Sequence, residues 1–160
     1  MVTPHPTRPD GLWLDDLHEG MSFASDTYEM TAESIIAFAT EFDPQPFHVD
    51  AESAEGTFFD GLVASGWHTA AVTMRLLING LPIATGIVGG GGELSWPSAA
   101  TDGDVLRVEG AVTRITRSRS RPEQAWVVVE HRTVNQRDEV RQTNSSRLLV
   151  WQRPRAGGNA

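Results

Sequence analysis

The stretch that decides the fold is GLVASGWHTAAVTMRLLING, which occupies residues 61–80. Apolar residues fall on nearly every side of a helix drawn through it, and the glycines at its two ends suit helix boundaries. A helix without a polar face has to be covered by other elements over most of its surface. We therefore expect a long, buried helix over Gly61–Gly80 in the centre of the fold.

The sequence pattern changes after this helix. Apolar and polar residues now alternate, β-branched and aromatic side chains are common, and turn residues interrupt the alternation. This pattern predicts four long strands, over Ile87–Trp96, Val105–Thr116, Ala125–Val134 and Val140–Trp151. Their short connections favour hairpins or a meander, so we expect an α+β fold in which an antiparallel β-sheet wraps one long central helix.

Smaller elements precede the long helix. The pattern predicts a strand over Met21–Tyr28, a helix over residues 32–42 that Thr31 caps, and one or two helical turns over Asp50–Glu55. The helix should end before Asp43, because a residue that precedes proline avoids the helical region. We expect a single domain over residues 13–153, with tails at residues 1–12 and 154–160.

Two residue types are absent from the chain. It contains no cysteine, and all thirteen basic residues are arginine, so lysine is missing as well. These absences exclude disulfides, cysteine-ligated metal sites, cysteine nucleophiles, Schiff-base lysines and the lysine of a phosphate-binding P-loop.

Charge is distributed unevenly along the chain. The net charge is −8, but residues 1–106 hold 2 arginines against 16 acidic residues, while residues 107–160 hold 11 arginines against 5 acidic residues. An acidic chain is a poor partner for nucleic acid, so we expect none. The arginine-rich part is either a solvated strand face or, for some arginines, a surface that meets an anionic ligand.

No segment predicts membrane insertion or export. The most apolar stretch, Leu62–Ile78, contains polar residues and is too short to span a bilayer comfortably. The N-terminal residues are polar and proline-rich, without the apolar run of a signal peptide. We expect a cytoplasmic protein and, because long strands leave an unpaired edge, a homodimer or higher homo-oligomer.

Three candidate functional motifs lack the residue spacing that their function requires. The glycine run Gly89–Gly92 lacks the spacing of a dinucleotide-binding loop and indicates a bulge or a close backbone contact instead. Ser65 lacks the flanking pattern of a hydrolase nucleophile elbow. The five histidines show no metal-ligand spacing, so we expect no metal site.

One constellation remains, FDPQPFH at residues 42–48. It joins the carboxylate of Asp43 to the imidazole of His48 through a loop that two prolines stiffen. In an extended segment these side chains would be roughly 15 Å apart, so the loop must curl if both are to touch one molecule. From the residues alone, an acid–base pair and a structural Asx-type turn with a hydrogen-bonded histidine both remain open.

The same segment resembles a family signature. FATEFDPQPFHVD at residues 38–50, followed by FDGLVASGW at residues 59–67, is similar to the MaoC-like hydratases, which include (R)-specific enoyl-CoA hydratases and acyl dehydratases of the hotdog fold. The family signature is D-x-N-P-x-H with a glycine eighteen residues after the histidine, and four positions match it: Asp43, Pro46, His48 and Gly66. The resemblance covers about residues 20–152 and implies a hotdog domain.

Two residues depart from the family pattern. Gln45 stands where the family usually has asparagine, and Ser65 stands where many members have histidine. Gln45 keeps an amide, so it can still orient the loop at a longer reach. The change at Ser65 concerns substrate contact and the preferred acyl chain rather than the acid–base pair.

The resemblance implies reversible addition of water to a 2-enoyl thioester, carried by CoA or by a carrier protein, without a metal or organic cofactor. Asp43 and His48 would hold the water and move both protons, while the backbone N–H of Gly66 would donate to the thioester oxygen. A glycine there would also leave room for the thioester. The candidates for substrate contact are Gln45, Ser65, Trp67 and Met74, and those for the CoA phosphates are Arg114, Arg117, Arg119 and Arg121.

Two other functions suit the same fold. In a hotdog thioesterase the carboxylate would activate water against the thioester carbonyl instead of the double bond. A non-catalytic acyl-CoA-binding domain would use the pocket without turnover, although the presence of both Asp43 and His48 favours catalysis.

Overall fold

The computed structural model describes residue 8 and residues 10–154 of the chain. A short 3₁₀ turn at Leu14–Asp16 precedes the regular elements. These follow in the order β1 (Ser22–Glu29), α1 (Ala32–Phe42), α2 (Pro46–Val49), α3 (Ala51–Ala54), α4 (Gly66–Gly80), β2 (Val88–Ser95), β3 (Val105–Arg117), β4 (Gln124–Val134) and β5 (Val140–Trp151).

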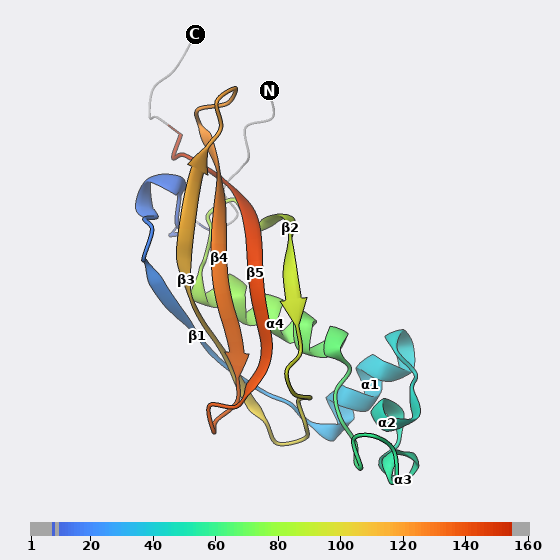
Figure 1. Cartoon of the computed structure of the whole chain (residues 1–160). Coiled ribbons are helices and arrows are strands. Elements are labelled where there is room, and N and C mark those ends of the chain that lie inside the picture. The colour runs from blue at the N-terminus through green and yellow to red at the C-terminus, as the bar shows by residue number, and fades with distance from the viewer. Residues whose placement is uncertain (1–7, 9, 155–160) are drawn as a thin grey trace.

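The strands form one antiparallel sheet in the order β1-β3-β4-β5-β2 (Figure 1). The predicted meander holds for β3, β4 and β5, which pair in sequence. Strand β2 instead pairs with β5 at one edge, and β1 pairs with β3 at the other. The two strands that flank α4 in the sequence therefore form the two edges of the sheet, with the meander between them.

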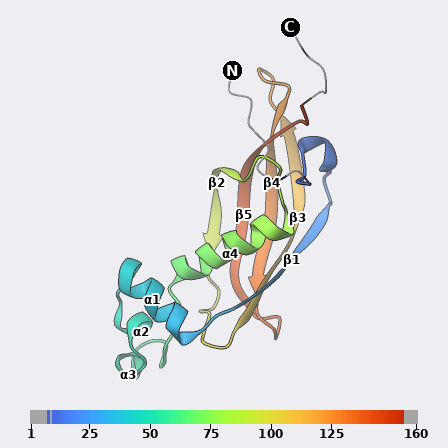
Figure 2. The same cartoon turned by 180° about the vertical axis from the view of Figure 1, so that it is seen from behind.

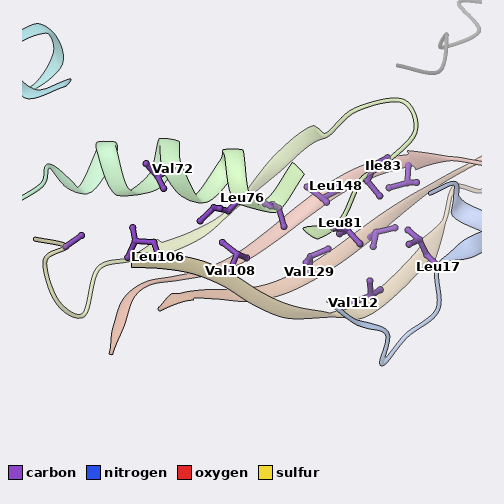
Figure 3. Packing of buried hydrophobic residues seen from close by; sticks show 14 of the residues in the cluster. Leu17, Val72, Leu76, Leu81, Ile83, Leu106, Val108, Val112, Val129 and Leu148 are labelled. Atoms are coloured by element: carbon purple, nitrogen blue, oxygen red, sulfur yellow. The ribbon is translucent and has the colours of Figure 1, made fainter. Parts of the chain in front are cut away.

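Helix α4 lies across one face of this sheet (Figure 2). Its buried residues Val72 and Leu76 point toward alternate residues of the central strands, among them Val108 and Val129 (Figure 3). Alternation matters because successive strand residues face opposite sides, which leaves every second side chain of β4 buried against the helix. Burying one such aliphatic side chain stabilises the fold by roughly 1.5–3 kcal/mol. The arrangement confirms the α+β prediction and is the hotdog fold.

The long helix begins five residues later than the sequence predicts. Residues 61–65 are not helical, because the N–H of Val63 donates to the carbonyl oxygen of Phe47 and the N–H of Ala64 donates to that of Ala100. Ser65 then caps α4 by accepting a hydrogen bond from the N–H of Trp67. These long-range bonds hold the segment before α4 in an extended form.

We expected α4 to be buried on most of its sides, but only the side that faces the sheet is buried. Trp67 and Met74, on another side, are 62% and 46% exposed. In the single chain, therefore, the side of α4 that carries Trp67 and Met74 is apolar and uncovered.

The smaller helices stand at one end of the molecule, beyond the N-terminus of α4 (Figures 1 and 2). Helix α1 has the predicted bounds and the predicted cap, since the Thr31 side chain accepts from the N–H of Ser34. Asp50 caps α3 in the same way through Ser53. The single turn of α2, by contrast, lies where the sequence indicated only a loop.

The glycine run forms an irregular part of edge strand β2. The pairing of β2 with β5 shifts register between Gly89 and Gly92, and Gly91 has a φ of +98°. A Cβ atom at Gly90 would collide with the ring of Trp126. The prediction of a bulge with a close contact is confirmed.

Part of the predicted N-terminal tail lies in the described residues and contacts the domain. Leu12 forms a parallel bridge with Ile83, and the guanidinium of Arg8 donates to the carbonyl oxygen of Ile78. Residues 1–7, 9 and 155–160 of the predicted tails lie outside the described residues. None of the helices in the described ranges is long and apolar enough to cross a bilayer.

Candidate active site

The loop between α1 and α2 curls back on itself. Asp43 ends α1, its N–H donating to the carbonyl oxygen of Ala39. The N–H of Gln45 then donates to the carbonyl oxygen of Asp43, and Pro46 starts the single turn of α2 that carries His48. The two turns bring His48 Nε2 to 3.5 Å from Asp43 Oδ2. The curl required for a joint site is therefore present.

The Asp43 carboxylate accepts hydrogen bonds at both oxygens. Ser65 Oγ donates to Oδ2 at 2.6 Å, and Gln45 Nε2 donates to Oδ1 at 2.7 Å. The Ser65 bond holds the pKa of Asp43 below its ordinary value; the Gln45 bond and the nearby His48 act in the same direction, against the opposing effect of partial burial. Asp43 is thus ionised at neutral pH, and the longer amide of Gln45 does reach it.

The imidazole of His48 is buried and held by the backbone. Its Nδ1 lies 2.7 Å from the carbonyl oxygen of Val63. Because a carbonyl oxygen only accepts, we assign a proton to Nδ1. This leaves Nε2 as the atom that faces Asp43. The contact to Val63 comes from the extended segment before α4, so the late start of that helix helps to orient the histidine.

The N-terminus of α4 completes the arrangement. Ser65 Oγ caps the N–H of Trp67, whereas the N–H of Gly66 has no acceptor among the described residues. This free N–H lies at the positive end of the helix dipole, where an oxyanion is favoured. Ser65 therefore contacts two parts of the site, because its hydroxyl also donates to Asp43.

Gly66 is required for a reason that the sequence did not indicate. A Cβ atom at this position would lie 2.8–3.0 Å from three atoms of the Trp96 indole. Real Cβ atoms do not approach ring carbons so closely, so any larger residue would displace the indole. The space beside the Cα of Gly66 is filled by Trp96 rather than left open for a ligand.

These groups border one pocket of about 340 Å³. Its lining is mostly aromatic and apolar and comprises Asp43, Gln45, Phe47, His48, Phe59, Ala64, Gly66, Trp67, Thr69, Trp96, Ser98 and Ala99. An apolar pocket with a few convergent polar groups is typical of a small-molecule site. A larger, open hollow of about 1030 Å³ is lined by strand residues such as Glu109 and Arg132, which pair with each other. His131 also lines this hollow, but among the described residues no carboxylate lies within ion-pair distance of its ring.

The sequence-predicted site residues divide into three groups. Five of them line the pocket: Asp43, Gln45, His48, Gly66 and Trp67. Ser65 is fully buried behind the pocket wall, and Met74, two helical turns beyond Trp67, is not among the lining residues. No arginine lines the pocket in the described part of the chain. The one arginine of α4, Arg75, lies over the ring of Tyr28.

Sequence reasoning missed several aromatic and small residues of the pocket wall. Phe47 and Phe59 pack edge to face at 5.1 Å, and Phe47 also contacts the His48 ring. Trp96, Ser98 and Ala99 belong to the segment that follows β2. The pairing of β2 with β5 in the sheet brings this segment to the pocket. No local pattern indicates such a contact.

Comparison with known proteins identifies the family and the fold. Residues 17–136 match the family model described as a MaoC like domain. A solved structure of the MaoC-like dehydratase from Rhodospirillum rubrum is 53% identical, with a TM-score of 0.88 over 90% of this chain and 99% of that one. The (R)-hydratase PhaJ1 from Pseudomonas aeruginosa shares the fold, with a TM-score of 0.73 and 22% identity over 89% of this chain and 88% of that one.

A curated relative adds a partial match. The uncharacterized protein YdeM from Bacillus subtilis is 40% identical over 65 residues, which span 41% of this chain and 46% of that protein. The chain therefore matches less than half of the length of that relative. The extent of the family match, together with the 53% identity over nearly the whole of a solved member, settles the relationship. This chain belongs to the MaoC-like dehydratase family.

Proposed function

We propose that this chain catalyses the reversible addition of water to the double bond of a 2-enoyl thioester. The observation that carries the proposal is the approach of His48 Nε2 to within 3.5 Å of Asp43 Oδ2 at the wall of an apolar pocket. The name of a relative with the same fold, an (R)-hydratase, and the dehydratase name of the 53% identical structure support it.

The reaction needs a group that takes a proton from water and a group that gives a proton to the α-carbon. Asp43 is ionised and so begins as a proton acceptor. A water that bridges Asp43 Oδ2 and His48 Nε2 would have its oxygen directed at the β-carbon. The oxygen then bonds to the β-carbon as the pair accepts a water proton, and the pair returns a proton to the α-carbon. Because the two groups interact closely, we treat them as one acid–base unit.

The negative charge that develops on the thioester oxygen needs a donor. The N–H of Gly66 supplies one at the positive end of α4. Ser65 keeps this N–H available, since its own oxygen caps the neighbouring N–H of Trp67. We therefore assign Ser65 to the positioning of Asp43 and of the helix start, and Gln45 and Trp67 to the wall that meets the substrate.

The acyl carrier is CoA or a carrier protein in this proposal. Both end in the same phosphopantetheine arm, but CoA adds phosphates that require cations. The candidates for that contact remain Arg114, Arg117, Arg119 and Arg121 of the arginine-rich strands and turns.

We also propose that the active form is a homodimer or a higher homo-oligomer. Edge strand β2 has an unpaired side, and the uncovered side of α4 carries Trp67 and Met74 at 62% and 46% exposure. Phe58 is 94% exposed in the loop near the pocket. A sedimentation mass at micromolar concentration that equals the single-chain 17.5 kDa would contradict the oligomer.

A spectroscopic assay separates the proposed reaction from its alternatives. Purified chain is mixed with crotonyl-CoA, and loss of the conjugated-thioester absorbance is followed beside release of free thiol. Hydration removes the conjugation without releasing thiol, a thioesterase releases thiol, and a binding domain does neither while still retaining the ligand in calorimetry. Thiol release without prior loss of conjugation would replace the hydratase by the thioesterase.

A further inference from the structure

Trp96 is placed where it restricts the pocket beside the proposed oxyanion donor. The residue follows β2, and its indole fills the space against the Cα of Gly66. It also meets the Trp67 ring edge to face, with the ring centroids 5.4 Å apart. The two tryptophans thus form one corner of the pocket at the start of α4.

A buried amide holds this indole in place. Trp96 Nε1 donates to Gln142 Oε1 at 2.8 Å, and Gln142, on β5, is 1% exposed. Gln142 Nε2 donates in turn to Asn144 Oδ1 at 2.6 Å, which fixes the amide with its oxygen toward the indole. Moving the ring would leave a buried acceptor without its donor, which is costly. The indole is therefore held on two sides, although 39% of the residue is exposed: the backbone of Gly66 blocks movement in one direction, and Gln142 anchors its polar edge.

We propose that Trp96 limits the size of the acyl group that the pocket accepts and that Gln142 is the residue that positions it. This inference rests on the proposed function. A thioester whose oxygen reaches the N–H of Gly66 has its acyl group beside the indole, because the two lie at the same helix terminus. Short, unbranched acyl groups fit this corner, and longer ones meet the ring.

The test measures substrate preference rather than total activity. The kcat/KM of the full chain and of its variants is determined for crotonyl-, hexenoyl- and octenoyl-CoA. We expect the wild type to prefer crotonyl-CoA and Trp96→Ala to raise the octenoyl-to-crotonyl ratio about tenfold or more, since methylenes in a hydrophobic pocket carry discrimination of that order. Trp96→Phe and Gln142→Leu remove the anchoring hydrogen bond and should give a smaller shift in the same direction.

A matched tryptophan on another part of the sheet serves as control. Trp126 packs against Gly90 and under the guanidinium of Arg147, and it does not line the pocket. Trp126→Ala removes a comparable ring and should leave the octenoyl-to-crotonyl ratio unchanged. Thermal unfolding of each variant, measured in parallel, separates a loss of folded protein from a change in preference.

The possible outcomes distinguish this inference from the function on which it rests. Turnover with a chain-length ratio that Trp96→Ala does not change overturns the role of Trp96 and leaves the hydratase intact. If no thioester turns over, calorimetry with saturated butyryl- and octanoyl-CoA replaces kinetics. If the wild type then binds one chain length more tightly and Trp96→Ala weakens that preference, the result supports the role of Trp96 but not the proposed hydratase reaction. Absence of both turnover and binding overturns both proposals.

Discussion

The hydroxyl of Ser65 donates a 2.6 Å hydrogen bond to Oδ2 of Asp43, a residue 22 positions earlier in the chain. The same hydroxyl accepts from the N–H of Trp67 at the start of α4. One side chain thereby ties the acid–base loop to the helix terminus that carries Gly66. The relative position of the Asp43 carboxylate and the Gly66 N–H, the proposed oxyanion donor, depends on this contact.

Replacing Ser65 by alanine should shift the pH dependence of catalysis. The Ser65 bond is the main cause of the lowered pKa of Asp43, so its loss raises that pKa. If ionised Asp43 is required, activity is lost as the pH falls through this pKa, and the acid limb of kcat/KM moves to higher pH in Ser65→Ala. A pH–rate profile of wild type and variant measures the shift.

The cap of α1 provides a control for this experiment. Thr31→Ala removes the cap of α1 far from the pocket, so both variants should lose about 1 kcal/mol of stability. Only Ser65→Ala should displace the acid limb. Equal profiles in all three proteins would remove Ser65 from the control of Asp43.

The space beside Gly66 predicts a sensitive position. Gly66→Ala forces its new methyl group against Trp96, and overpacking of this kind costs about 1–3 kcal/mol. Gly90→Ala creates a closer collision of the same kind with Trp126, away from the pocket. We expect both variants to unfold at lower temperature, but only Gly66→Ala to lose the proposed hydratase activity per folded molecule. A similar loss in Gly90→Ala would argue against a specific role for Gly66.

His131 makes stability depend on pH. Its burial in the core lowers its pKa to about 4, from 6.5 for the free side chain. The unfolded chain therefore binds a proton on His131 between pH 6.5 and about 4 that the folded protein does not bind. We expect the contribution of His131 to stability to be greatest above pH 6.5 and to fall by roughly 3 kcal/mol as the pH drops through this window.

Denaturant unfolding at several pH values tests this dependence. His131→Leu removes the titrating group and should flatten the curve between pH 6.5 and 4. His18→Gln, at an exposed position, should follow the wild type. An unchanged slope in His131→Leu would show that other groups cause the loss.

The buried pair of Asp104 and Arg141 should dominate the stability of the turn between β4 and β5. Burial alone would raise the pKa of Asp104, but hydrogen bonds from Arg141 and Asn135 outweigh it and keep the carboxyl ionised. Arg141→Gln removes the two guanidinium hydrogen bonds and leaves only the 3.6 Å contact to exposed Arg137 as an ion pair, so we expect a cost of up to about 3–5 kcal/mol. Arg132→Gln breaks only an exposed pair with Glu109 and should cost less than about 1 kcal/mol in the same unfolding experiment.

Local patterns were enough to predict most of the fold. The strands of the meander follow from alternation, which is clearest in β4 and partial in β3 and β5, and α1 follows from its Thr31 cap. The start of α4 could not be predicted in this way. It depends on bonds from Val63 and Ala64 to residues that are distant in the sequence.

In the candidate site, too, some features follow from the local sequence and others depend on long-range contacts. Asp43 and His48 are five residues apart, and from the residues alone a joint acid–base role and a structural turn were both open; the resemblance to the MaoC-like signature favoured the joint role. The contacts that tune the pair, from Ser65 and from the carbonyl of Val63, cross the fold and have no local pattern. The same holds for Trp96, whose place beside Gly66 follows from the pairing of β2 with β5.

The most direct measurement is the rate of crotonyl-CoA hydration by Asp43→Asn, with Asp26→Asn as the matched control. Asparagine keeps the shape of the side chain but cannot accept the water proton, so we expect kcat/KM to fall by about 10²–10⁴-fold while the circular dichroism spectrum is unchanged. Asp26 lies on exposed strand β1, away from the pocket, and its variant should keep wild-type activity. Wild-type hydration by a folded Asp43→Asn protein would contradict the assignment of this acid–base pair.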